Sequence, residues 1–115
     1  VMAGQTLAAA LAGAEASASA KILIVRINAP TSPHFAADLD AVVHSRVDYL
    51  NLPKVESAAE VAAACAAIAA VEKTRGIARP IPLLVNIESP RALRLAAEIA
   101  AADPRVAGLQ LGFAD

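Results

Sequence analysis

The feature that most constrains the fold of this chain is the alternation of short apolar runs with longer segments of helical periodicity. Four runs have the length and composition of strands, and they cover 21–30, 47–55, 81–89 and 106–115. The segments between them, 33–45, 57–75 and 90–102, carry apolar residues at the spacing of a helix face. Because no hairpin signal joins neighbouring runs, we expect right-handed strand–helix–strand units, which build the parallel sheet of an α/β fold.

The first run is apolar at consecutive positions, from Ile22 to Val25 and again at Ile27. Such continuity is typical of a strand that is buried on both faces, as in parallel sheets. Two architectures fit the pattern: an open doubly wound sheet, or part of a (β/α)8 barrel. The phosphate-binding patterns GxGxxG and GxxxxGK[ST] do not occur in the sequence, so a nucleotide site is less favoured.

The helix boundaries are marked by capping residues. Ser57 and Glu60 form a capping-box pattern, and Gly76 is the expected C-terminal breaker of the same helix. Ser89 is the expected N-cap of the next helix, with Pro90 at its first position. The residues of this helix that we expect to face the sheet are Leu93, Ala97 and Ala100. A further helix is expected over 7–18.

Length and composition exclude several classes of protein. The chain has 115 residues, which fit one domain or part of a larger one, and it begins Val1-Met2 and ends directly after the fourth run, so we expect a fragment. A net charge of −1 favours neither a nucleic acid nor an anionic membrane as partner, and no run approaches the roughly 18 apolar residues that span a bilayer. The single cysteine, Cys65, excludes an internal disulfide and favours the cytoplasm. No basic residue beside Cys65 would lower its pKa, so we interpret it as core filler.

Polar residues gather at the carboxyl ends of the apolar runs, where parallel α/β proteins carry their chemistry. They are Arg26, Asn28, Asn51, Lys54, Asn86, Glu88, Gln110 and Asp115. If the third and fourth strands are neighbours, about 4.8 Å apart, Glu88 and Asp115 converge at one mouth. Two carboxylates repel each other unless a cation or a proton joins them, and a hard divalent ion such as Mg²⁺ fits such a pair. Arg26 would add a fixed cation for a carboxylate or a developing enolate oxygen, which suggests carbon–carbon chemistry at a 2-oxo acid or a thioester.

Each of these residues also has a structural interpretation. Glu88 could favour the positive end of the helix that follows it, and Asp115 could be the N-cap of a later helix. Arg26 could pair with a carboxylate for structural reasons. Lys54 and Glu56 flank a helix start, where a structural role is favoured.

Four consecutive motifs carry a family resemblance: VRINAPTSPHFAADLDAV, VDYLNLPKVESAAEV, RPIPLLVNIESPRAL and RVAGLQLGFAD. Together they resemble the HpcH/HpaI aldolase/citrate lyase family, and within it the citrate lyase β-subunit-like and malyl-CoA lyase-like proteins. The resemblance covers 21–115, in the right order and with compatible spacing. Ser89 departs from the family pattern, in which threonine is commoner, but it keeps the N-cap.

The resemblance implies a (β/α)8 TIM barrel, of which this chain would supply the second to fifth strands and lack the first and the last three. It implies that Arg26 is the catalytic residue that holds the oxo-acid, that Glu88 and Asp115 bind Mg²⁺ (with Mn²⁺ as an alternative ion), and that Arg26 and Glu88 contact the substrate. It also implies a homo-oligomer, a trimer or a hexamer. Residues that contact CoA cannot be assigned from these motifs.

The expected activity of the full-length protein is Mg²⁺-dependent cleavage or formation of a 3-hydroxyacyl-CoA thioester. Citryl-, malyl- or citramalyl-CoA would be split into acetyl-CoA and an oxo-acid. The alternatives are a class II pyruvate-type aldolase without CoA, and a non-catalytic α/β binding or oligomerisation module. A partial barrel exposes sheet edges and an open core, so we expect the isolated fragment to be inactive.

Overall fold

The computed structural model describes residues 21–112. Its elements, in chain order, are β1 (Ile24–Arg26), α2 (Phe35–Val42), β2 (Tyr49–Leu52), α3 (Ala58–Arg75), β3 (Leu83–Ile87), α4 (Pro90–Arg94), α5 (Ala96–Ala100) and β4 (Val106–Leu111). The helix expected over 7–18 and the proposed ligand Asp115 lie outside the described residues.

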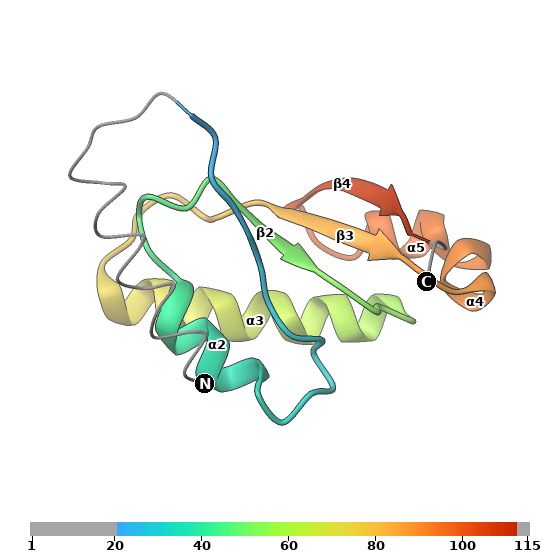
Figure 1. The fold of residues 1–115 in the computed structure, drawn as a ribbon, viewed down its shortest axis with the longest axis horizontal. Coiled ribbons are helices and arrows are strands. Elements are labelled where there is room, and N and C mark those ends of the chain that lie inside the picture. The colour runs from blue at the N-terminus through green and yellow to red at the C-terminus, as the bar shows by residue number, and fades with distance from the viewer. Residues whose placement is uncertain (1–20, 113–115) are drawn as a thin grey trace.

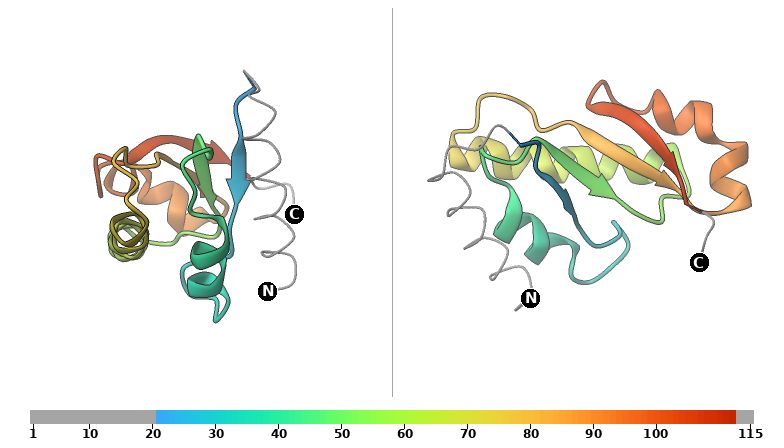
Figure 2. Two further views of the ribbon diagram at one scale, coloured as in Figure 1. Left: turned by 90° about the vertical axis from the view of Figure 1, so that its left-hand side faces the viewer. Right: turned by 45° about the horizontal axis from the view of Figure 1, so that its top comes forward.

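The strands form a single parallel sheet in the order β1-β2-β3-β4, so each strand pairs with the next one along the chain (Figure 1). The predicted parallel α/β fold is therefore confirmed. Both α2 and α3 lie on the same side of this sheet (Figure 2). A doubly wound sheet would reverse its strand order and carry helices on both faces, whereas a barrel keeps the order and places its helices outside. The arrangement is that of a partial (β/α)8 barrel.

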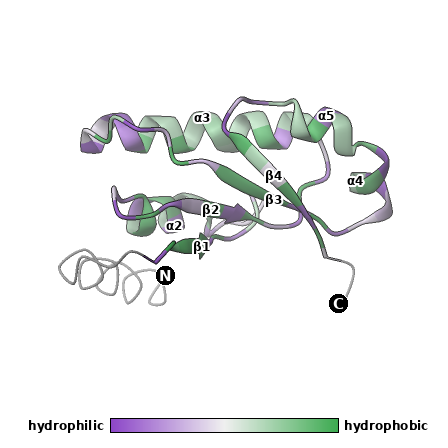
Figure 3. Ribbon diagram, turned by 90° about the horizontal axis from the view of Figure 1, so that it is seen from above, coloured by the Kyte–Doolittle hydropathy of each residue, from purple (hydrophilic) through white to green (hydrophobic). Residues whose placement is uncertain are grey.

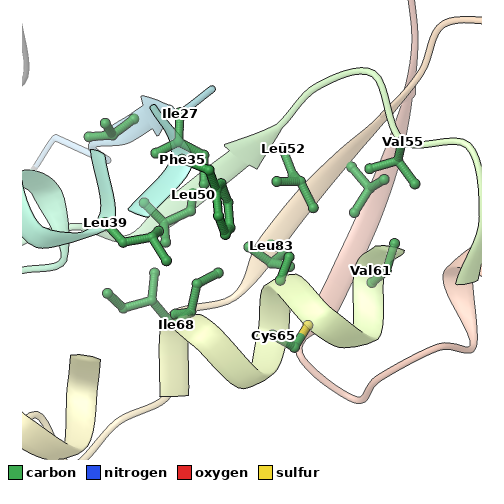
Figure 4. Packing of buried hydrophobic residues seen from close by; sticks show 14 of the residues in the cluster. Ile27, Phe35, Leu39, Leu50, Leu52, Val55, Val61, Cys65, Ile68 and Leu83 are labelled. Atoms are coloured by element: carbon green, nitrogen blue, oxygen red, sulfur yellow. The ribbon is translucent and has the colours of Figure 1, made fainter. Parts of the chain in front are cut away.

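The hydrophobic core lies between the sheet and its helices (Figure 4). Side chains along a strand point alternately to the two faces of the sheet. The ribbons of β1 and β3 are predominantly hydrophobic in composition (Figure 3). Buried strand and helix residues in this layer include Val25, Ile27, Leu50, Leu52, Leu83, Val85, Ile87, Leu39, Val61 and Ile68. Cys65 belongs to the same cluster and is 3% exposed, which agrees with its interpretation as core filler.

The opposite face of β1 is open. Ile22 and Ile24 are 69% and 51% exposed, whereas Val25 and Ile27 are buried against the helices. The prediction that the first run is buried on both faces is therefore wrong for residues 21–112, because no described element covers this side of β1. In a complete barrel this face of the strand points into the barrel interior. It is exposed here because a partial barrel leaves that interior open, as we expected.

Helix α3 has the predicted ends. Ser57 accepts a hydrogen bond from Glu60 N at 3.2 Å, and Gly76 ends the helix with a φ of 69°, a left-handed conformation that glycine adopts without strain. The reciprocal half of the capping box differs from the prediction, since the Glu60 carboxylate accepts from Glu56 N at 2.9 Å. The loop before α3 is thereby tied to the first turn of the helix.

The segment 90–102 differs from the single helix that we predicted. It forms α4 and α5, which meet at Leu95, a residue with φ −101° and ψ 15°. Leu93 is 51% exposed, and Ala97 and Ala100 are also exposed, so the prediction that these residues face the sheet is wrong. Ala92 and Ile99 are buried instead, and Leu95 packs against the same core, so the buried face lies one residue earlier than predicted and carries two large apolar side chains.

An ion pair that the sequence analysis missed lies at the amino ends of β3 and β4. Arg105 donates to both carboxylate oxygens of Glu72, at 2.7 and 2.9 Å, and to Ile81 O at 2.9 Å. Glu72 also accepts from Ile81 N at 2.7 Å. Hydrogen bonding to Glu72 raises the pKa of Arg105, and the contacts tie α3 to the starts of both strands.

Candidate active site

Arg26 and Glu88 both lie at the carboxyl ends of the strands, where their positions in the sequence placed them, and the structure brings the two side chains together. Arg26 is the last residue of β1, and Glu88 follows β3 directly. The Arg26 guanidinium lies 3.8 Å from Glu88 Oε2, across the intervening strand β2. The Arg26 side chain is 60% exposed and that of Glu88 is 16% exposed, so solvent weakens this pair and leaves the guanidinium accessible.

The backbone of Lys54 holds Glu88 in place. Lys54 N donates to Glu88 Oε2 at 2.8 Å. Lys54 has a φ of 57°, and it is the one non-glycine residue with positive φ in the described part of the chain. That conformation costs about 1 kcal/mol or more for a residue with a side chain, so the loop stores strain at the point where its amide meets the carboxylate.

Strand β4 ends beside Glu88. Gly112 N donates to Ile87 O at 2.9 Å, and a Cβ on Gly112 would lie 3.4 Å from Glu88 Cγ. Asp115 follows Gly112 by three residues in the sequence but lies outside the described residues. The predicted pairing of Glu88 with Asp115 therefore stays a prediction.

Three of the strand-end amide side chains form a polar layer below Glu88. Asn51 Nδ2 lies 2.9 Å from Asn86 Oδ1, 3.2 Å from Gln110 Oε1 and 3.1 Å from Leu84 O. Asn51 and Asn86 are 8% and 9% exposed. Since Nδ2 has two hydrogens for three acceptors, the bonds are shared, and the layer links β2 to both β3 and β4.

Asn28, which we also placed at the mouth, instead closes the loop between β1 and α2. Its backbone N and its Nδ2 both donate to Asp38 Oδ2, at 2.8 and 2.5 Å. The sequence signal was ambiguous, because a polar residue after a strand can serve either the site or the loop.

Glu56 is a further residue at this edge, and it contacts the residue next to Glu88. Ser89 Oγ donates to Glu56 Oε2 at 2.5 Å and accepts from Ala92 N at 3.0 Å. Ser89 is therefore the N-cap that we predicted for the helix beginning at Pro90. No pattern local to Glu56 indicates its partner, because the two residues are 33 positions apart.

The described residues at the carboxyl edge of the sheet supply some, but not all, of the ligands that a hard divalent cation needs. Glu88 supplies a restrained carboxylate, and Oε1 accepts no hydrogen bond from residues 21–112. Within the same range no group of three or more His, Cys, Asp and Glu side chains is placed to hold a metal ion. Since Mg²⁺ binds proteins through one or two carboxylates and keeps several waters, Glu88 can supply one ligand of such a site.

Cys65 and the helices exclude two further roles for the described residues, a cysteine nucleophile and a membrane-spanning helix. Burial, with Asp103 nearby, raises the pKa of the Cys65 thiol to about 11, so this cysteine is no nucleophile at neutral pH. The helices of the described segment are all too short or too polar to cross a membrane.

Comparison with known proteins gives a consistent family. Residues 2–115 match the family model of the HpcH/HpaI aldolase/citrate lyase proteins. The L-malyl-CoA/beta-methylmalyl-CoA lyase of Cereibacter sphaeroides is 38% identical over 98 residues, which are 83% of this chain and 31% of the relative. The chain thus spans about a third of the length of the curated relatives that it matches.

Solved structures that resemble this chain include citrate lyase proteins, in agreement with the family match. A citrate lyase from Burkholderia xenovorans matches with a TM-score of 0.70 at 29% identity, over 76% of this chain and 28% of that structure. A citrate lyase beta subunit from Mycobacterium tuberculosis, complexed with oxaloacetate and magnesium, matches with a TM-score of 0.55 at 35% identity, over 77% of this chain and 33% of that structure. With its parallel strands, its strand-end Arg26 and Glu88 and a family match over nearly its whole length, the chain belongs to the HpcH/HpaI aldolase/citrate lyase family.

Proposed function

We propose that the full-length protein containing this segment is a Mg²⁺-dependent carbon–carbon lyase. It cleaves or forms a 3-hydroxyacyl-CoA thioester, such as citryl-, malyl- or citramalyl-CoA, with acetyl-CoA and an oxo-acid as the other side of the reaction. The observation that carries the proposal is the meeting of Arg26 and Glu88, from two different strands, at one mouth of the sheet. A malyl-CoA lyase relative and a citrate lyase beta subunit complexed with oxaloacetate and magnesium support the substrate class and the ion.

Glu88 and Asp115 would hold the Mg²⁺ ion, which as a Lewis acid polarises an oxygen of the oxo-acid. Lys54 N restrains the Glu88 carboxylate, so its position does not depend on the ion alone. The exposed Arg26 guanidinium binds the oxo-acid and stabilises negative charge on its oxygen. In the cleavage direction the 3-hydroxyl loses its proton and the carbon–carbon bond breaks. Its electron pair passes to the enolate of the thioester, which takes up a proton to give acetyl-CoA.

The segment supplies the second to fifth strands of the barrel in this proposal, and the parent protein supplies the first strand and the last three. The open face of β1, with Ile22 and Ile24 exposed, supports further chain on that side. Leu111 at the end of β4 is also 70% exposed. The assembled protein is a cytoplasmic homo-oligomer, a trimer or a hexamer.

The test uses the full-length protein with malyl-, citramalyl- and citryl-CoA, and with pyruvate-type 4-hydroxy-2-oxo acids as CoA-free substrates. We expect Mg²⁺-dependent release of acetyl-CoA, lost on chelation. Removal of charge stabilisation at an oxyanion costs about 10²–10³ in kcat, so Arg26→Met should fall in that range. Turnover of the CoA-free acids alone would identify a class II aldolase, and no turnover of any of them would favour a non-catalytic module. Unchanged Mg²⁺ affinity in Glu88→Gln would remove the metal-ligand role.

A further inference from the structure

We infer that Glu56 and Ser89 form a clamp that positions Glu88, which makes both of them positioning residues for the proposed metal site. The inference rests on the proposed function, since it assigns the support of a carboxylate that would bind Mg²⁺. It goes beyond the proposed function because it assigns the position of the Glu88 carboxylate to the loop between β2 and α3, which contacts the turn after β3.

The clamp is centred on the Ser89 hydroxyl. Its proton goes to Glu56 Oε2 at 2.5 Å, a short charge-assisted bond, while its oxygen accepts from Ala92 N at 3.0 Å. Donation to a carboxylate polarises the hydroxyl and makes its oxygen a better acceptor, so the two bonds strengthen each other. Ser89 is therefore held from both sides, by the loop before α3 and by the first turn of α4.

Glu56 itself sits on a rigid base. Its backbone N donates to Glu60 Oε1 at 2.9 Å, in the first turn of α3. The neighbouring Val55 is 0% exposed, and Pro53 is also buried. Because the loop is anchored in the core on one side of Glu56 and in a helix on the other, Glu56 can hold Ser89 instead of following it.

The same loop reaches the two consecutive residues of the turn after β3 at two points. Lys54 N binds the Glu88 carboxylate at 2.8 Å, and Glu56 Oε2 binds the Ser89 hydroxyl. The first contact sets where the Glu88 carboxylate lies, and the second sets the backbone from which it projects. Contacts at both points restrain Glu88 more than either alone, and a misplacement of about 1 Å at a catalytic group can cost 10²-fold in rate.

Loss of the Ser89 hydroxyl should therefore loosen Glu88. In Ser89→Ala, the Glu56 carboxylate loses its hydroxyl donor, and the loop before α3 no longer contacts the residue that follows Glu88. Ser89→Thr keeps both hydrogen bonds, because threonine is also an N-cap residue with a hydroxyl. Glu56→Gln keeps an acceptor oxygen but removes the charge, so its effect should lie between wild type and Ser89→Ala.

The experiment measures Mg²⁺ affinity by isothermal titration calorimetry, and thermal stability in parallel, on the full-length protein. Loss of the groups that orient a metal-binding side chain typically costs about 10–100-fold in metal affinity, so Ser89→Ala should weaken Mg²⁺ binding at least tenfold. Ser89→Thr should bind as wild type does. In the double variant Glu56→Gln/Ser89→Ala, the loss should not exceed that of Ser89→Ala alone, because one clamp has been broken in both.

Thr74→Ala is the control, since it also removes a helix hydroxyl but lies at the far end of α3, where Thr74 donates to Ala70 O at 3.0 Å. It should leave Mg²⁺ affinity unchanged. Equal affinities for Ser89→Ala and Thr74→Ala, or additive losses in the double variant, would overturn the clamp. Glu88→Gln separates the two ideas: if it weakens Mg²⁺ binding while Ser89→Ala does not, only the clamp fails. If Glu88→Gln binds Mg²⁺ as wild type does, the proposed metal role fails as well.

Discussion

Replacement of Arg105 by methionine should destabilise the full-length protein severely, although Arg105 lies at the end of the sheet away from the candidate site. Arg105 and Glu72 form a buried ion pair in which the side chains are 9% and 6% exposed. Arg105→Met removes the cation and keeps much of the apolar stem. Of the hydrogen bonds to the Glu72 carboxylate described above, only the one from Ile81 N, at 2.7 Å, then remains.

The magnitude follows from this geometry. Breaking a buried pair by removing one partner costs about 3–5 kcal/mol, because the other charge stays buried without compensation. The bidentate contact, at 2.7 and 2.9 Å, and the third bond to Ile81 O place this pair in that range. In the double variant Glu72→Gln/Arg105→Met neither charge of the pair is buried, and the amide oxygen introduced at position 72 can still accept from Ile81 N. The double variant should therefore recover about 2 kcal/mol or more of the loss seen in Arg105→Met.

The assay is the free energy of unfolding from urea denaturation, with activity as a check that the folded state is native. Asp40→Asn is the control: Asp40 is 84% exposed and 3.0 Å from Arg75, so loss of this surface pair should change the free energy of unfolding by less than about 1 kcal/mol. A loss in Arg105→Met no larger than that in Asp40→Asn would refute the reasoning, as would strictly additive effects of Glu72→Gln and Arg105→Met.

Two further predictions concern pH. The pKa of Cys65 is raised to about 11 by burial, from an ordinary value of 9.0. The folded state therefore holds this proton more tightly than the unfolded state, and the stabilisation is present below pH 9 and is lost as the pH rises towards 11. The slope of unfolding free energy against pH over that window should be smaller in Cys65→Ala, and an identical slope would contradict the assignment. The pKa of Asp48 is lowered, chiefly by the hydrogen bond from Leu23 N at 2.7 Å and then by Arg46. The stabilising contribution of Asp48 to the free energy of unfolding is present above pH 3.8, and it is lost as the pH falls through the lowered pKa. Acid titration of Asp48→Asn should therefore show a weaker dependence on pH in that range; the same acid dependence as wild type would argue against it.

Local sequence signals predicted the fold well. The four apolar runs became four parallel strands, and Ser57, Gly76 and Ser89 cap helices as expected. These predictions succeeded because capping and strand continuity depend on residues that are neighbours in the chain. The strand order did not follow from the connections alone, since consecutive strand–helix–strand units build both a doubly wound sheet and a barrel. The family resemblance implied the barrel, and the structure has the order β1-β2-β3-β4 that a barrel requires.

The prediction of which face of the segment 90–102 packs against the sheet was wrong for a physical reason. A regular helix from Pro90 would have presented Leu93, Ala97 and Ala100 on one face. The buried face instead carries Ala92, Leu95 and Ile99, at spacings that a regular helix also brings to one side. Alanines give little hydrophobic signal to distinguish the two faces, and the buried one has two large apolar side chains, Leu95 and Ile99, where the predicted one has only Leu93.

For this protein the sequence by itself determined the order of elements, their capped ends and the polar residues at the carboxyl edge of the sheet. Arg26 and Glu88 were placed at that edge because parallel strands carry their carboxyl ends on one side. The tertiary structure alone decided which of these side chains meet: Arg26 with Glu88, Asn28 with Asp38, and Glu56 with Ser89. The buried pair of Glu72 and Arg105 belongs to the same class, because its partners are 33 residues apart and neither shows a local pattern. Such contacts depend on how adjacent strands and loops are brought into register, and that register exists only in the folded chain.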